Sequence, residues 1–167
     1  MGQKELMLLD WMRKIHQLEY GHCFQSIYYN TIEKFTGLSA FVLSTLAAFS
    51  YRFPFIHEEV VKSYILPFIL LIVAILTGYQ SFIKPGEKAE THRKLGIEYE
   101  KIRHEIEKIL TNYSHIQNVD ELITDVKSNW DSLNTLYVKE SKYSEAKKKV
   151  KSFNKYPKEL HFLPDIE

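Results

Sequence analysis

Two uncharged, strongly apolar runs lie close together in the first half of the chain, at Phe35–Tyr51 and Ser63–Ile83. As α-helices, their 17 and 21 residues would extend about 26 and 32 Å. The hydrocarbon core of a bilayer is about 30 Å thick, so each run is long enough to cross it once. The runs predict two membrane spans, at 35–53 and 63–83. The alternative is a pair of buried helices in a soluble α-helical domain, which rarely contains two such runs in so short a protein.

The remaining sequence is polar and nearly balanced in charge. The mean hydropathy of −0.26 conceals this division, because residues 84–167 carry 16 Lys/Arg and 15 Asp/Glu. With a net charge of only +1, no overall field favours nucleic acid, and we expect no direct nucleic-acid partner. The single cysteine, Cys23, excludes a disulfide within the chain and is typical of a reducing cytosolic compartment.

Lys and Arg are concentrated beside the outer flanks of the two runs rather than between them. Lys34 precedes the first run, and Lys84, Lys88, Arg93 and Lys94 follow the second. Such residues favour the cytoplasmic side of a membrane. The sequence therefore predicts a multi-pass protein of the cell inner membrane, with the lipid bilayer as its first partner and both termini in the cytoplasm.

Helical periodicity continues on both sides of the predicted hairpin. Residues 1–34 carry an apolar stripe without a proline, which predicts an amphipathic cytoplasmic helix continuous with the first span. Lys84-Pro85-Gly86 should break the second span and start a new helix. Within 84–113 the stripe has coiled-coil spacing, and its expected partner is the N-terminal helix of the same chain or of a neighbouring subunit. The predicted fold class is all-α: a two-span transmembrane hairpin with long amphipathic cytoplasmic helices.

Residues 114–167 are expected to form a C-terminal helical extension. Asn118, as an N-cap, with Glu121 three residues later predicts a helix start. A last helix is predicted from Ser144 to about Lys155, and it carries a lysine cluster. These lysines could contact anionic lipid or a phosphate-bearing ligand, or they could form a solvated basic face; they are Lys147, Lys148, Lys149 and Lys151.

The sequence contains no recognisable catalytic, cofactor-binding or metal-binding motif, so we expect neither an enzyme nor a bound cofactor or metal. His22 and His92 both fall on the predicted apolar stripes. One interpretation is a paired, pH-sensitive or gating contact, and the other is a pair of hydrogen-bonded interior histidines.

Small residues recur on one face of each predicted span. They are Gly37, Ala40, Ser44 and Ala47 in the first span, and Thr77, Gly78 and Ser81 in the second. Such faces let helix backbones pack closely in lipid. Their hydroxyls could instead line a polar path through an oligomer. One hairpin cannot enclose a pore, so this interpretation requires a homo-oligomer, a tetramer or larger. It predicts that Ser44→Leu reduces conductance without preventing assembly.

The order of these features resembles the SLATT family, the two-transmembrane effector domains associated with SMODS and SLOG components of bacterial defence. The similarity covers roughly residues 8–113. It is carried by the helix with Gly21-His22, the short hairpin, the Lys84–Arg93 stretch, Gly96, and the pattern His92, Tyr99, Arg103. The resemblance implies a pore-forming effector of a nucleotide-signalling or anti-phage system, triggered by a partner enzyme that makes a second messenger or by a sensor.

Two functions are compatible with these features. The first is an oligomeric membrane pore or ion channel that is controlled by its cytoplasmic helices. The alternative is a non-conducting membrane anchor or scaffold whose cytoplasmic part recruits a soluble partner. Replacement of the spans by generic Leu/Ala helices would separate the two, because only an anchor should tolerate it.

Overall fold

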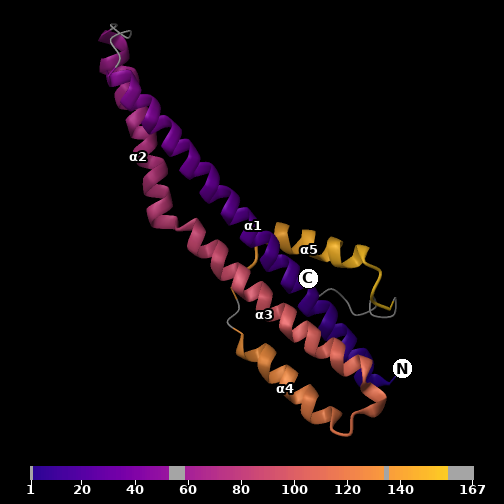
Figure 1. Cartoon of the computed structure of the whole chain (residues 1–167). Coiled ribbons are helices and arrows are strands. Elements are labelled where there is room, and N and C mark those ends of the chain that lie inside the picture. Colours follow the sequence, from indigo (N-terminus) through magenta and orange to yellow (C-terminus); the bar gives the residue numbers. More distant parts are fainter. Residues whose placement is uncertain (1, 53–58, 134–135, 158–167) are drawn as a thin grey trace. The chain divides into compact units, whose positions relative to one another are not determined.

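The computed structural model describes residues 2–52, 59–133 and 136–157. All regular elements in these ranges are helical, as the sequence predicts (Figure 1). In chain order they are α1 (Gln3–Arg52), a π-helical turn η1 (Val61–Ile65), α2 (Leu66–Ile83), α3 (Pro85–Thr111), a 3-10 turn η2 (Tyr113–His115), α4 (Val119–Ser132) and α5 (Glu140–Ser152). The predicted end of the first span at Phe53, most of the predicted loop, and the last ten residues of the predicted extension lie outside the described residues.

The contacts divide the chain into two units. We call Ile27–Ala89 the apolar hairpin, and the described residues of Met1–Ser26 and Glu90–Glu167 the charged bundle. The sequence-based domain limits after residues 34, 83 and 113 are a different division of the chain, and they stay predictions.

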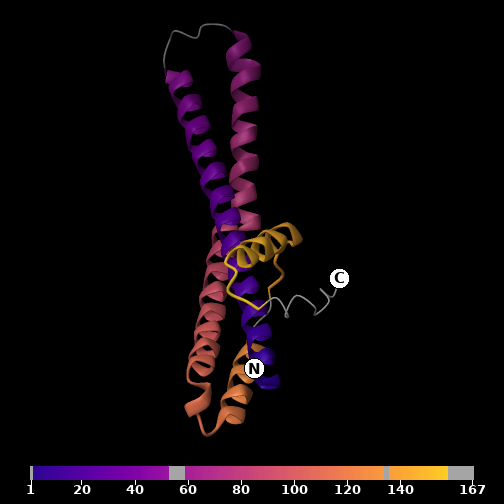
Figure 2. The same cartoon turned by 90° about the vertical axis from the view of Figure 1, so that its right-hand side faces the viewer.

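Two helical stretches, Gln3–Ser50 and Val61–Thr111, are long and apolar enough to cross a membrane. The first lies in the single 50-residue helix α1, which confirms that the N-terminal helix continues into the first apolar run. In the apolar hairpin the second half of α1 and helix α2 run side by side (Figure 2). No residue of α2 is buried, so its apolar side chains largely face outward.

The predicted break after the second run is confirmed at Lys84. This residue adopts a left-handed conformation, with φ 50° and ψ 57°, and its N–H donates to the Gln80 carbonyl (3.1 Å). Pro85 then begins α3, where its missing N–H leaves no intrahelical bond unmade. Proline also disfavours the right-handed helical conformation in the residue before it, which explains why the break occurs here. Pro67 lies in the first turn of α2, directly after η1.

The charged bundle has one hydrophobic core, contributed by α1, α3 and α4. Its buried members are Leu8, Ile15, Tyr99, Ile102, Ile106, Ile109 and Val126. All of them except Val126 lie in the two segments for which the sequence predicts an apolar stripe, 1–34 and 84–113. The partner of α3 is therefore the N-terminal helix of the same chain, one of the two arrangements that the sequence leaves open.

Two details of the C-terminal extension differ from the prediction. Helix α4 begins after Asn118, but the Asn118 side chain does not cap it and instead donates to Glu121 Oε2 (3.3 Å). Helix α5 begins at Glu140 rather than Ser144 and ends at Ser152 rather than near Lys155. Glu140 places a negative charge in the first turn, where the helix dipole favours it. Asn154, at φ 50°, adopts the left-handed conformation that commonly ends a helix.

Candidate functional site

The small residues of the first apolar run lie on the less exposed face of the hairpin. Ala47 is buried, and Gly37, Ala40 and Ser44 are half-buried. On α2 the candidates Thr77 and Ser81 are exposed, and a Cβ added at Gly78 would meet nothing within 4 Å. The two predicted small faces therefore differ, since the first lies toward the inside of the hairpin and the second is open.

Polar contacts join the two helices where the chain enters and leaves the hairpin. Gln80 Nε2 donates to the Glu33 carbonyl and to Thr36 Oγ1, both at 3.1 Å. The Glu33 carboxylate lies against Gly86, in the first turn of α3, where no side chain could fit without displacing it. An anionic group is favoured at a helix N-terminus. No local pattern predicts the Glu33–Gly86 contact, because the two residues are 53 positions apart.

The residues on which the predicted family resemblance rests come together in the charged bundle. His22 Nδ1 and His92 Nδ1 are 2.9 Å apart, and both rings are buried. Since one nitrogen must donate and the other accept, the contact requires at least one neutral ring. Tyr99 stacks on His22 with ring centroids 5.4 Å apart and an interplanar angle of 23°. Gly96 faces α1 nearby, where an added Cβ would make an ordinary contact, 3.6 Å from the Glu19 carbonyl. The two histidines are thus interior and in hydrogen-bonding contact.

Burial keeps this histidine pair neutral. Desolvation, followed by the nearby His92 ring, lowers the pKa of His22 from 6.5 to about 4. Desolvation also lowers the pKa of His92 and raises the pKa of the Tyr99 hydroxyl.

The low pKa of His22 predicts acid destabilisation of the bundle. Its folded pKa is about 4 against an ordinary 6.5, so the unfolded chain binds protons first as the pH falls. The free energy of unfolding should fall by about 2 kcal/mol between about pH 7 and pH 5 from this residue alone, with no further loss below about pH 4. His22→Gln should remove that share of the slope, as measured by thermal unfolding across this range. An unchanged slope would contradict the assignment.

Arg103, the remaining SLATT-like residue, forms an interhelix ion pair. Its Nε donates to Glu19 Oε2 at 2.6 Å, and its guanidinium lies 3.6 Å from Glu107. The Arg103 and Glu19 side chains are only 12% and 17% exposed. The pair therefore ties α3 to α1 in a largely desolvated setting.

Helix α5 and the residues before it pack against α1. The Lys139 N–H donates to Gln25 Oε1 (3.2 Å). Gly21 faces Val138 and Tyr143, and a Cβ added there would lie 3.4 Å from Val138 Cγ1, in van der Waals contact.

A second contact fixes the segment that follows α5. The Phe153 ring stacks on His16 at 5.6 Å, and Tyr156 Oη lies 2.8 Å from His16 Nδ1. Desolvation, with Arg103 and Lys155 nearby, lowers the pKa of His16 to about 4. These partners could not be predicted from the sequence, because they fall on no shared periodic stripe.

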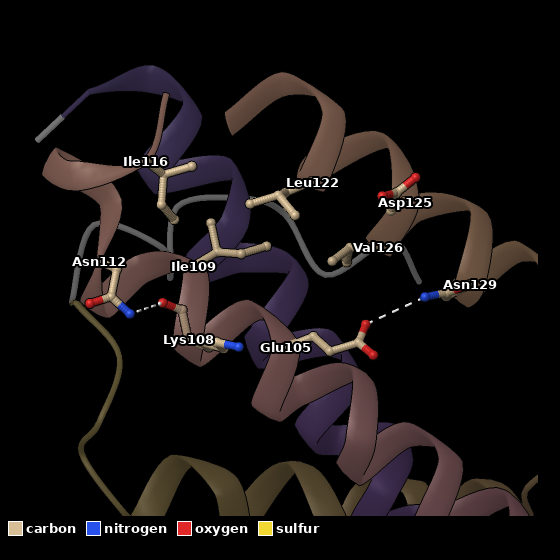
Figure 3. Close-up of a pocket in the computed structure, with 9 residues that line it drawn as sticks. All are labelled: Glu105, Lys108, Ile109, Asn112, Ile116, Leu122, Asp125, Val126 and Asn129. Carbon is tan, nitrogen blue, oxygen red and sulfur yellow. Dashed lines mark hydrogen bonds between the residues drawn. The ribbon is translucent and has the colours of Figure 1, made fainter. Parts of the chain in front are cut away.

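A pocket of about 470 Å³ opens between α3 and α4 (Figure 3). Its lining combines four apolar side chains, Ile109, Ile116, Leu122 and Val126, with polar residues that include Glu105, Asp125 and Lys108. Asn129 Nδ2 lies 3.4 Å from Glu105 Oε2. The pocket could hold the apolar part of a small molecule.

The predicted lysine cluster lies on α5. Ala146 and Val150 are buried, whereas Lys148, Lys149 and Lys151 are exposed. Lys147 and Lys149 lie over the rings of Tyr143 and Phe153, at 5.6 and 5.3 Å. The lysines therefore occupy the outer side and flanks of a helix that is anchored by its apolar side.

No group of three or more His, Cys, Asp or Glu side chains within the described ranges could hold a metal ion. Comparison of the chain with protein-family models, curated proteins and solved structures gives no match.

Proposed function

We propose that the protein is an oligomeric pore-type membrane effector. In this proposal the apolar hairpin spans the bilayer, several hairpins assemble, and the charged bundle on the cytoplasmic side controls opening. The supporting observation is the outward-facing apolar surface of the hairpin. Phe41, Phe68 and Phe82 are 68%, 63% and 88% exposed. At about 25 cal/mol per Å² of apolar surface, such exposure in water would be costly, whereas lipid would cover it.

The continuous helix α1 supports the proposed control. It carries His22 of the bundle and Ser44 of the hairpin without a break. A change in bundle packing could therefore move the first span directly. The SLATT resemblance supports the same proposal, and it favours a nucleotide-signalling enzyme or a sensor of a bacterial defence system as the source of the trigger.

The open small face of α2 is the better candidate for a lumen or an interhairpin contact. Thr77 and Ser81 are exposed, whereas Ser44 is half-buried on the inward face of the hairpin. Leucine at Ser44 would thus alter packing within the hairpin as well as any lumen, and Thr77→Leu is the cleaner test.

Ion flux from liposomes tests the proposal. Full-length protein should release ions, and Thr77→Leu should reduce the flux by roughly an order of magnitude if Thr77 faces the lumen. Phe68→Leu, at another exposed position, is the control and should retain the flux. Cross-linking should show that all variants still assemble. Absence of flux from the assembled wild-type protein, with candidate cyclic nucleotides present, would contradict the pore.

A non-conducting anchor is the second candidate, and one observation favours it. Ser44 Oγ donates to the Phe41 carbonyl (2.9 Å), and Thr77 Oγ1 donates to the Val73 carbonyl (2.8 Å). These hydroxyls therefore need no water. If the protein is an anchor, Leu/Ala replacement of both spans should preserve its effect on bacterial growth. Loss of that effect, with normal membrane insertion, would contradict the anchor.

A further inference from the structure

We propose that the exposed face of α5 binds anionic lipid headgroups of the membrane that holds the hairpin. The inference rests on the proposed membrane insertion and adds a second, electrostatic contact to it. The contact surface consists of Lys148 and Lys151, flanked by Lys147 and Lys149.

Lys148 and Lys151 lie close together near the end of α5. Several other exposed lysines pair with an acid one turn away, as in Lys101–Glu98 at 2.7 Å, Lys127–Asp131 at 2.5 Å and, at the start of α5 itself, Lys142–Glu145 at 2.9 Å. Among the described residues, Lys148 and Lys151 form no ion pair with an acid. They are also three positions apart on one helix face, where like charges repel.

Helix stability alone does not account for this pattern. Basic residues in the last turn of a helix interact favourably with its dipole, and Lys149 and Lys151 lie there. Lys148 lies just before the last turn, and its positive charge repels those of Lys149 and Lys151. Lys148 and Lys151 therefore form a surface suited to a negative partner that the described part of the chain does not supply.

The partner can be identified from its charge and from how α5 is held. Ala146 and Val150 are buried, so the apolar side of α5 is already occupied within the bundle. The Lys139 N–H donates to Gln25 Oε1 and so holds the start of α5 within the bundle, which leaves its basic side exposed. A bilayer containing anionic lipid offers a dense negative surface that attracts clustered lysines. This polar, basic face suits headgroup contact rather than insertion.

The test uses full-length protein in nanodiscs and a dye on α5. With Cys23 replaced by Ser, Ser144→Cys places the dye on the exposed face, one turn before Lys148. Quenching by acrylamide, which is uncharged, reports how accessible the dye is to water. In discs containing phosphatidylglycerol the quenching constant should be about half that in phosphatidylcholine discs, since lysines bind anionic headgroups. Addition of about 0.5 M salt should remove the difference by screening.

Two double variants of equal charge change provide the control. Lys148→Gln with Lys151→Gln should abolish the lipid-dependent protection, whereas Lys94→Gln with Lys101→Gln on α3 should preserve it. Circular dichroism should show equal helix content in both. Equal quenching in the two lipids would overturn the proposal, as would protection that survives Lys148→Gln/Lys151→Gln. Protection that depends on two copies sharing a disc would assign the face to a second copy and also overturn it.

The experiment distinguishes a failure of the α5 proposal from a failure of the proposed membrane function. Protein that fails to enter the discs would contradict membrane insertion itself. Protein that enters them without lipid-dependent protection would contradict only the assignment of α5. Neither outcome depends on ion flux.

Discussion

Tyr99→Ala is expected to lower the free energy of unfolding of the charged bundle by about 3–5 kcal/mol. The Tyr99 ring is 1% exposed, stacks on His22, and belongs to the core that joins α1, α3 and α4. Alanine would remove these contacts and leave a cavity that the surrounding helices can fill only in part. It would also expose one side of the neutral histidine pair.

The measurement is urea or thermal unfolding in detergent, followed by tryptophan fluorescence. Trp11 and Trp130 report on the bundle, since their rings meet edge to face at 5.9 Å. Tyr137→Ala is the matched control, because this side chain is 79% exposed, and its effect should be within about 0.5 kcal/mol. Equal effects of the two substitutions would contradict the role of Tyr99 in the core.

Arg103→Gln is expected to cost about 3 kcal/mol, because it leaves the Glu19 carboxylate largely buried without its partner. Glu19→Gln should cost less, because the Arg103 guanidinium keeps its ion pair with Glu107 at 3.6 Å. The double variant, Glu19→Gln with Arg103→Gln, should be less destabilising than the sum of the two, since amide groups can bond to each other without a buried charge.

The same unfolding measurement, arranged as a double-mutant cycle, gives the coupling between the two residues. Arg93→Gln is the control, because Arg93 pairs with Glu90 within α3 and its side chain is 60% exposed. Solvent screens an exposed pair of this kind, so its loss should change the stability little. Additive effects at Glu19 and Arg103 would show that the ion pair does not tie α3 to α1.

The helical elements could be predicted because their signals are local. Two uncharged runs, a Lys-Pro-Gly break, and apolar stripes with 3-4 spacing each lie within one segment, and helices α1, α2 and α3 confirm them. The boundaries of α5 were less predictable, because Asn154 in a left-handed conformation ends the helix in the middle of a lysine-rich sequence. The predicted start of α4 was correct, but the predicted cap was wrong, because the Asn118 side chain makes no capping hydrogen bond.

For the candidate residues, too, local patterns predicted the positions on the helices, whereas packing decided the contacts. Periodicity placed His22 and His92 on the predicted stripes. Only the packed helices show that the two imidazoles are 2.9 Å apart and that Tyr99 stacks on His22. The two small-residue faces look alike in sequence. Burial distinguishes them, because the first run has its small face inside the hairpin and α2 has Thr77 and Ser81 outside.

Sequence alone thus determined the helical class, the two apolar helices, the break at Lys84 and the internal stripes, since these depend on residue type and short-range spacing. Tertiary structure decided which stripes meet, which polar groups are desolvated, and which contacts join distant segments, such as His16 with Tyr156 and Glu33 with Gly86. Those properties arise when residues far apart in the chain pack together and exclude water. No local sequence pattern specifies which distant residues meet.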